Sequence, residues 1–188
     1  MDVIKLGGSL CQPEWMPFLL DWLEARLRLA PFVLVCGGGV HADAVRSEQQ
    51  RLGYDDLTAH RQALLAMEQT AWFVAAAWTA RHGRKIAVGG EAAEGSVWVP
   101  RALLDDSRIA ASWSITSDSL AAWYAGQISA ERLLVLKALP WAQAPGGPDD
   151  WAAHAWVDPA FPAYVRAAGC RAALLGQASW KTVPADLP

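Results

Sequence analysis

The sequence predicts an α/β fold, a three-layer αβα sandwich around a largely parallel sheet. Short apolar runs alternate with amphipathic stretches that have helical spacing, which is the pattern of strand–helix units. The apolar runs are continuous rather than alternating, as in strands that are covered on both faces. The chain has 188 residues, 53% of them apolar, and no internal repeat or long linker. We therefore predict a single domain over residues 1–188.

The N-terminal half has the order strand, helix, strand, helix, followed by one long helix. The first four elements are predicted over Asp2–Leu6, Glu14–Leu29, Phe32–Cys36 and Val40–Leu52. Apolar residues at three- and four-residue spacing then predict a helix over Thr58–His82, with its N-cap at Leu57-Thr58.

The C-terminal half is predicted to add three longer strands and a short one at the sheet edge. The expected elements are a strand over Lys85–Val88, a turn over Gly89–Gly95, an edge strand over Val97–Val99, a brief helix from Pro100 to Leu104, a helix over Ser119–Gln127, a strand over Arg132–Leu139, a loop over Pro140–Asp150, a helix over Pro159–Ala168 and a strand over Arg171–Gly176. Disorder is expected only in Gln143–Asp150 and in the tail from Pro184.

The composition argues against large charged partners. The chain has 16 basic and 19 acidic residues, a net charge of −3 and no block of like charge. This balance is unlike that of nucleic-acid or anionic-membrane surfaces, so the expected ligands are small molecules. No secretory leader or membrane-length apolar stretch is visible, which predicts a cytoplasmic protein. The three cysteines lack C-x-x-C spacing and an even count, so we predict neither a metal site nor a disulfide framework.

Tryptophan is unusually frequent, with 11 residues. Several lie in helical patterns and are expected in the core, namely Trp15, Trp22, Trp72, Trp78 and Trp123. Because aromatic residues are also enriched at interfaces, an apolar face left over on such a small domain would favour a homodimer or a higher homo-oligomer.

Two glycine clusters each follow a predicted strand directly. Gly7, Gly8 and Ser9 follow the first strand, and Gly37–Gly39 follow the second. Glycine lets the backbone N–H groups approach a ligand closely, and the start of a helix adds partial positive charge. Glycine also occurs in such turns simply to turn the chain. The sequence contains neither the P-loop nor the dinucleotide-binding motif. We therefore predict two neighbouring anion cradles of another kind.

Three charged residues are placed to act on a phosphoryl group. Lys5 lies at the end of the first strand, where a buried ammonium is costly unless it meets an anion. Asp118 follows Thr116 and Ser117 at a helix start, where capping alone would also explain it. Lys137 lies near the end of a later strand and is the natural second cation. Phosphoryl transfer requires mainly positioning and charge neutralisation, which this set provides.

Other basic residues near the second cradle are candidates for binding an acidic substrate. They are His41, Arg46, His60 and Arg61. Arginine forks match phosphate and carboxylate groups well. For each of these residues an ordinary surface role is the alternative.

Together the motifs resemble the amino acid kinase superfamily. The resemblance rests on Val3–Ser9, Cys36–Gly39 and Thr116–Ala122, in that order. It implies MgATP as donor, with Gly7, Gly8, Ser9, Thr116 and Ser117 on the nucleotide phosphates, and an acceptor bound near Gly37–Gly39. It also implies that Lys5 and Asp118 lie at the transferring phosphate.

Within the superfamily, the sequence is most similar to the methanofuran-pathway kinase of [5-(aminomethyl)furan-3-yl]methyl phosphate and its bacterial C1-carrier relatives. The residues that carry this finer similarity are His60–Gln69, Ser112–Asp118 and Trp156–Pro162.

The chain departs from the family where the nucleotide is expected. Family members continue the strand of Lys137 into an aspartate-valine-aspartate-glycine turn, whereas this chain reads Lys137–Ala142 without it. The sequence therefore predicts a kinase fold that is shortened at its nucleotide-binding end. A small-molecule kinase is the predicted function. The alternatives are a non-catalytic anion-binding protein or assembly subunit that has lost the nucleotide half, and a structural protein with idle glycine loops.

Overall fold

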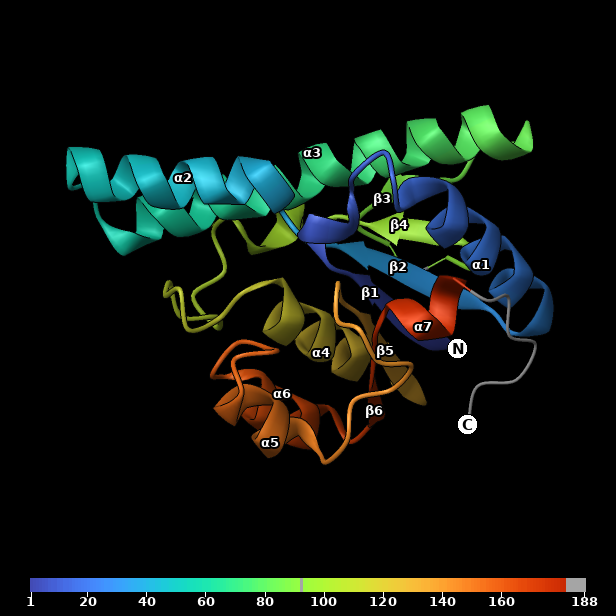
Figure 1. The fold of residues 1–188 in the computed structure, drawn as a ribbon. Helices are drawn as coiled ribbons and strands as arrows, with labels where there is room; N and C mark the ends of the chain where they lie inside the picture. Colours follow the sequence, from blue (N-terminus) through green and yellow to red (C-terminus); the bar gives the residue numbers. More distant parts are fainter. Residues whose placement is uncertain (92, 182–188) are drawn as a thin grey trace.

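The computed structural model describes residues 1–91 and 93–181 and contains a six-stranded sheet in the order β3-β4-β2-β1-β5-β6, in which all neighbouring strands are parallel (Figure 1). The strands are β1 (Asp2–Leu6), β2 (Phe32–Cys36), β3 (Val88–Gly89), β4 (Ser96–Trp98), β5 (Arg132–Leu136) and β6 (Arg171–Leu175). The helices are η1 (Gly8–Leu10), α1 (Met16–Leu29), α2 (Gly39–Leu52), α3 (Asp56–His82), η2 (Arg101–Leu103), α4 (Ser117–Gln127), α5 (Pro148–Ala153), α6 (Phe161–Ala168) and α7 (Gln177–Lys181).

The sheet is buried on both faces, as its continuous apolar strands predict. Alternate residues of β1 point to opposite faces, so Val3 belongs to one core cluster and Ile4 to the other. Helices α4, α5 and α6 supply the first cluster, and α1 and α7 supply the second. The long α3 contributes to both. The predicted αβα architecture with a parallel sheet is confirmed.

Two sequence-based expectations, the N-cap of the long helix and the strand at the edge of the sheet, are wrong. Helix α3 begins at Asp56, and the side chain of Asp55 accepts a hydrogen bond from the Thr58 backbone N–H. The predicted N-cap at Leu57-Thr58 is therefore wrong, because the better acceptor lies two residues earlier. The predicted edge strand is also wrong. Strand β4 pairs with both β2 and β3, and the short β3 forms the edge.

The segment expected to be a loop with disorder is ordered by the neighbouring strand. Gln143 forms an antiparallel bridge with Leu175, and the buried Ala144 donates its N–H to the Leu174 carbonyl. Helix α5 begins inside the same segment, at Pro148. The sequence also gave no indication of α7. The predicted disorder in the tail from Pro184 lies outside the described residues.

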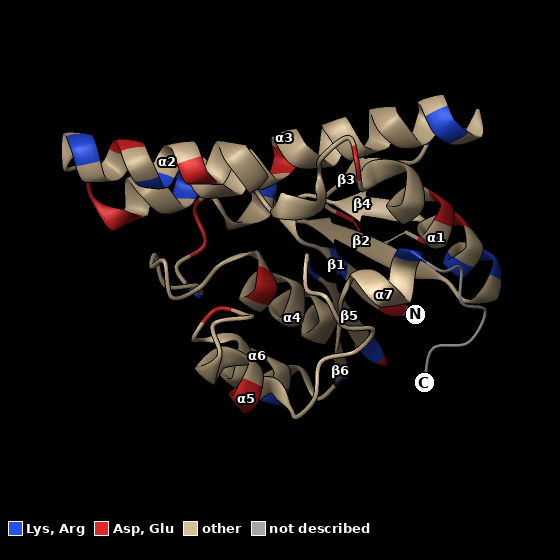
Figure 2. Cartoon of the chain, viewed as in Figure 1, with Lys and Arg blue, Asp and Glu red and all other residues tan. Residues whose placement is uncertain are grey.

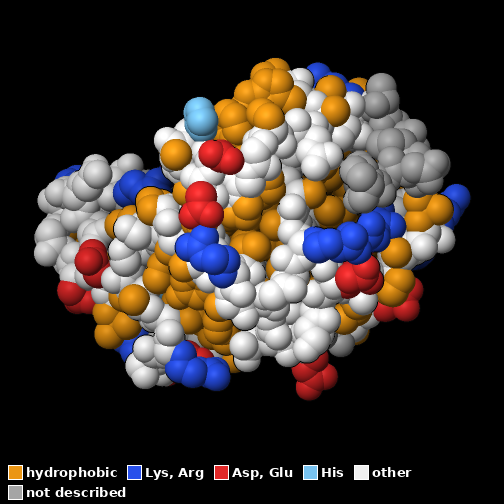
Figure 3. Space-filling view, turned by 90° about the horizontal axis from the view of Figure 1, so that it is seen from below, with side chains coloured by type: hydrophobic (Ala, Val, Ile, Leu, Met, Phe, Trp, Pro, Cys, Tyr) orange, Lys and Arg blue, Asp and Glu red, His pale blue; other side chains and the backbone are white. Residues whose placement is uncertain are grey.

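The surface carries mixed charge and some exposed apolar groups. Basic and acidic residues are interspersed along α1, α2 and α3 (Figure 2). Hydrophobic side chains lie between separate charged groups on the face seen from below (Figure 3). Trp22 and Trp78 are buried as expected, whereas Trp72 is 57% exposed beside Phe73 on α3. The homo-oligomer stays a prediction.

None of the helices in the described residues is sufficiently long and apolar to cross a lipid bilayer.

Candidate active site

The site lies where the connections of the sheet change direction. The chain leaves β1 toward β2 on one side, and it leaves β5 toward β6 on the other, although β1 and β5 are neighbours. In open α/β sheets such a switch point leaves a crevice at the carboxyl ends of the strands. Lys5 pairs in register with Val135 of β5, so its side chain points to the face covered by α4.

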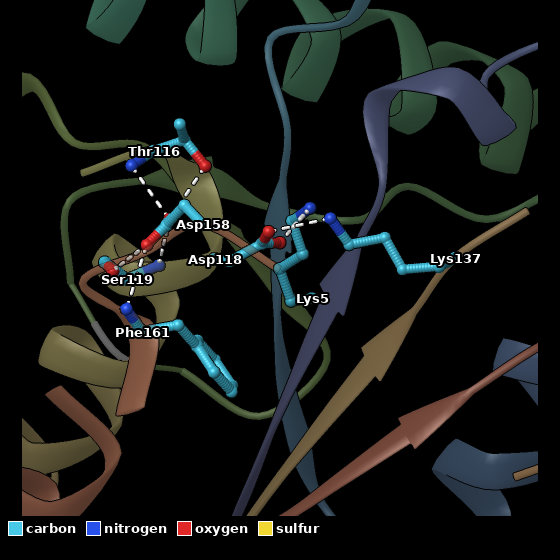
Figure 4. A network of polar contacts seen from close by, with 7 residues as sticks. All are labelled: Lys5, Thr116, Asp118, Ser119, Lys137, Asp158 and Phe161. Carbon is cyan, nitrogen blue, oxygen red and sulfur yellow. Dashed lines mark hydrogen bonds and ion pairs between the residues drawn. The ribbon is translucent and has the colours of Figure 1, made fainter. Parts of the chain in front are cut away.

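A carboxylate held between two ammonium groups forms the floor of this crevice (Figure 4). The Lys5 Nζ atom lies 2.6 Å from Asp118 Oδ1, and Lys137 Nζ donates to Asp118 Oδ2 at 2.7 Å. The side chains of Lys5 and Asp118 are each only 3% exposed. With all three groups ionised the cluster has an excess positive charge, and water reaches it only at Lys137, whose side chain is 21% exposed. An anionic ligand would neutralise that charge.

The charges in the cluster shift the pKa values of two of its members. Burial alone would raise the pKa of Asp118, but the nearby Lys5 and Lys137 outweigh burial and lower it. Asp118 is therefore ionised at neutral pH. Burial, and then the charge of Lys5, lower the pKa of Lys137 to about 8, and the attraction of Asp118 offsets only part of this shift.

This pKa predicts how activity depends on pH. Lys137 carries its charge below about pH 8 and loses it as the pH rises through that value. For the phosphoryl transfer that the sequence motifs predict, we expect kcat/KM to fall above about pH 8, because the uncharged amine cannot neutralise a phosphate. In Lys137→Arg this alkaline decline should move beyond pH 10, since arginine stays protonated there. The measurement is a pH–rate profile of both proteins, and an unchanged decline in Lys137→Arg would contradict the assignment.

Asp118 is positioned by a residue that is distant in sequence. The buried Asp158 carboxylate accepts hydrogen bonds from the backbone N–H and hydroxyl groups of both Thr116 and Ser119, at the start of α4. It also accepts one from the Phe161 N–H, which starts α6 (Figure 4). Asp158, the residue before Pro159, therefore holds the first turn of α4 in place. Sequence analysis did not select Asp158 as a site residue. Its position before a helix signals an N-cap of α6, but not the cap of α4.

The two glycine clusters touch each other. A Cβ atom on Gly8 would lie 2.2 Å from the Gly39 nitrogen, and one on Gly37 would lie 2.8 Å from the Gly8 nitrogen and 3.0 Å from Ser117 Oγ. Only glycine permits this approach of the backbones. Gly39 also has a φ of +54°, in the left-handed region. The loops thus form one continuous rim beside Asp118.

A cavity of about 250 Å³ opens between this rim, α2, α3 and the loop before α4. The predicted site residues that line it are Lys5, Gly7, Gly8, Ser9, Gly37, Gly38, Gly39, Arg46, His60, Thr116, Ser117, Asp118 and Lys137. The sequence analysis missed other lining residues, namely Ala42, Asp43, Asp56, Ala59, Ala63, Leu64, Met67, Ser112, Trp113, Ile115 and Leu120. Helical spacing gave no indication that these side chains share a cavity with the glycine loops.

Two predicted substrate-binding residues are not part of the cavity lining. His41 is exposed on the first turn of α2. Arg61 donates to the Leu104 carbonyl and pairs with Asp105 at 2.7 Å, on the outer side of α3. His41 follows Gly37–Gly39 closely in sequence, and Arg61 follows His60. Neighbouring side chains on a helix point to different sides, so closeness in sequence does not bring either residue into the cavity.

The outer part of the cavity combines an aromatic ring with polar groups. The Arg46 guanidinium lies 4.3 Å from the centre of the Trp113 ring, which in turn donates to the Gln49 side chain. His60 is 8% exposed, and none of the described residues hydrogen-bonds to its Nε2 atom. Burial lowers the pKa of His60, so the ring is neutral at pH 7. A ligand group is the natural partner for that nitrogen.

The described residues do not provide a preformed Mg²⁺ site. They contain no group of three or more His, Cys, Asp or Glu side chains that could hold a metal ion. Both oxygens of Asp118 face ammonium groups instead. Mg²⁺ is commonly bound by substrate phosphates with few protein ligands. The ion implied by the kinase resemblance would therefore have to enter with the phosphates.

Solved structures share this architecture. Uridylate kinase from Archaeoglobus fulgidus aligns with a TM-score of 0.67 and 13% identity over 94% of this chain and 90% of its own. The chain has the amino acid kinase fold. UMP kinase from Ureaplasma parvum gives a TM-score of 0.67 and 14% identity over 96% and 91% of the two chains. Aspartate kinase from Synechocystis gives 0.67 and 12%, with 94% of this chain matching 40% of that larger one. The sequence matches no protein-family model and no curated protein significantly.

Proposed function

We propose that the protein is a kinase that transfers the terminal phosphoryl group of MgATP to a small phosphorylated or carboxylated acceptor. The observation that carries this proposal is the cluster of Lys5, Asp118 and Lys137 on the floor of a cavity rimmed by both glycine loops. The kinase fold agrees with it.

The charges assign a role to each group. Lys5 and Lys137 would neutralise the negative charge that spreads over the phosphoryl oxygens during transfer. The N–H groups of the glycine rim would add hydrogen bonds, except those of Gly7 and Gly37, which donate to the Leu136 and Leu6 carbonyls. Asp118 would hold the two ammonium groups in place. Because both of its oxygens face ammonium groups and its pKa is lowered, Asp118 is a poor proton acceptor. This favours an acceptor whose attacking oxygen is already ionised, as in a phosphate or a carboxylate.

Within that class we propose [5-(aminomethyl)furan-3-yl]methyl phosphate, the acceptor of the kinase that the sequence resembles. Its phosphate would lie at the glycine rim beside Lys5. Its flat ring suits the apolar walls near Met67 and Trp113, and its ammonium group suits Asp43 or Asp56, which are the acidic lining residues besides Asp118.

The proposal is tested by following phosphorus NMR while the protein is incubated with MgATP and this acceptor. We expect ADP to accumulate together with the paired resonances of a new diphosphate, because the attacking phosphate oxygen forms a P–O–P bond. Arg46→Ala should raise the KM for the acceptor several-fold, because it removes the guanidinium that stacks on Trp113, the ring that the acceptor is expected to contact. Arg51→Ala, on the exposed surface of the same helix, is the matched control. Transfer to a simple alcohol but to no phosphate or carboxylate would contradict the acceptor class.

A second candidate is a non-catalytic protein that binds a small anion. It is favoured by the lining of the cavity, which includes no described residue after Lys137, where the resemblance places the nucleotide. Calorimetry separates the two candidates. Binding of inorganic phosphate or the acceptor, without heat from ATP and without transfer, would favour the binding protein.

A further inference from the structure

We infer that the phosphoryl donor is recognised through its phosphate chain, with its base outside the site, so that the enzyme scarcely distinguishes nucleoside triphosphates from one another. This inference rests on the proposed function and concerns the donor specificity of the same site. It depends on what surrounds the crevice on the β2 side and on the β6 side.

On the β2 side the space is already limited. A donor phosphate at Lys5 and Lys137 leaves the rest of a nucleotide to extend toward either β2 or β6. The cavity toward β2 measures about 250 Å³. Pockets that enclose a whole drug-sized ligand measure roughly 300–1,000 Å³. The cavity is therefore too small to enclose an acceptor together with a nucleoside.

On the β6 side the chain covers the strand ends with a strap, residues 138–144. The strap is hydrogen-bonded along its length to the end of β6 and to the start of α7. The Gln177 N–H donates to the Leu139 carbonyl, the Ala178 N–H to the Trp141 carbonyl, the Gly176 N–H to the Ala142 carbonyl and the Ala144 N–H to the Leu174 carbonyl. The carboxyl ends of strands are where this class of sheet binds ligands. Here the protein's own backbone occupies the end of β6.

The packing of the strap shows that it is a fixed part of the molecule. A Cβ atom on Gly176 would lie 2.3 Å from the Trp141 carbonyl oxygen and 2.6 Å from that of Leu139, so strap and strand end are in direct contact. Leu139 and Trp141 also pack against the core cluster of the α4 face. Trp141 contacts Trp156 with ring centroids 4.4 Å apart. Opening the strap for a base would break these backbone hydrogen bonds and expose core side chains.

The chemistry needs only the phosphate end of the donor. The acceptor oxygen forms a bond to the terminal phosphorus while the bridging P–O bond breaks, and the electron pair leaves with the diphosphate group. The leaving group is a nucleoside diphosphate, or inorganic diphosphate when the donor is inorganic triphosphate. Lys5, Lys137 and the glycine rim contact phosphate oxygens in either case.

The test is calorimetric titration of the full chain with the magnesium complexes of ATP, GTP, UTP, CTP and inorganic triphosphate. We expect the four nucleotides to have Kd values within about tenfold of one another, because sites that read a hydrogen-bonding group discriminate by far more than this. Lys5→Met should weaken all five ligands by a similar factor, whereas Lys85→Met on the exposed surface should weaken none.

The possible failures are distinct. Binding of one nucleotide about a hundredfold more tightly than the others would overturn the inference and leave the proposed function standing. Absence of heat from all five ligands would overturn the inference together with the proposed kinase function. The proposed function fails separately if the triphosphates bind but phosphorus NMR shows no transfer to any phosphate or carboxylate acceptor.

Discussion

Replacing Lys5 by methionine is expected to lower kcat by about two to three orders of magnitude, the usual effect of removing one preorganised group that stabilises transition-state charge. The Lys5 side chain is 3% exposed, so water cannot take the place of its ammonium group. Methionine keeps the length and apolar stem of the side chain but removes the charge. Single-turnover phosphorus NMR or coupled ADP release measures the effect.

The fold should survive this substitution. Asp118 keeps its ion pair with Lys137, so no buried charge is left without a partner. Circular dichroism melting should therefore give a similar Tm for Lys5→Met and the parent protein. Lys85→Met is the matched control, since Lys85 is exposed. A Lys5→Met protein with undiminished kcat would remove Lys5 from the proposed mechanism.

Asp158→Ala is expected to have the largest effect on stability. The substitution leaves the N–H groups of Thr116 and Ser119 without the carboxylate that accepts from them, whereas the Phe161 N–H keeps its hydrogen bond to the backbone carbonyl of residue 158. Each buried donor that loses its partner costs about 1–3 kcal/mol, so the free energy of unfolding should fall by about 2–6 kcal/mol for the two N–H groups. Urea denaturation followed by tryptophan fluorescence measures this change.

The control for Asp158→Ala is another aspartate of the same region. Asp149 lies on α5, its side chain is 75% exposed, and it pairs with Arg166. Asp149→Ala should change the free energy of unfolding by no more than about 1 kcal/mol. Asp158→Asn, which keeps one acceptor oxygen, should fall between the two. A loss below about 1 kcal/mol in Asp158→Ala would show that other groups or water satisfy the start of α4.

Much of the site could be predicted because its residues lie at the carboxyl ends of strands. The bounds of β1 and β2 agree with the expected Asp2–Leu6 and Phe32–Cys36. Each strand is followed at once by glycines, and the carboxyl ends of parallel strands share one edge. The sequence therefore predicted that Lys5 and both glycine loops lie at the same edge of the sheet. The contact of Lys5 and Lys137 with Asp118 follows from the helix start at that edge.

Residues on helices were harder to place. His60 lines the cavity and Arg61 does not, because a single helical step separates the inner from the outer side of α3. Trp113 lay in a segment of family similarity but was not selected as a site residue, and Asp43 lay in no motif. Both reach the cavity through the packing of α2 against the loop before α4.

By itself the sequence determined the αβα class, the glycine rim and the charged residues at the strand ends, because these depend on local periodicity and on what glycine alone permits. Only the tertiary structure decided that Asp158 accepts hydrogen bonds from the start of α4, and that residues 138–144 cover the end of β6. Both features are hydrogen bonds between segments far apart in the chain. The local sequence shows which polar groups need a hydrogen-bond partner. Which group becomes that partner depends on the folding of distant segments against one another.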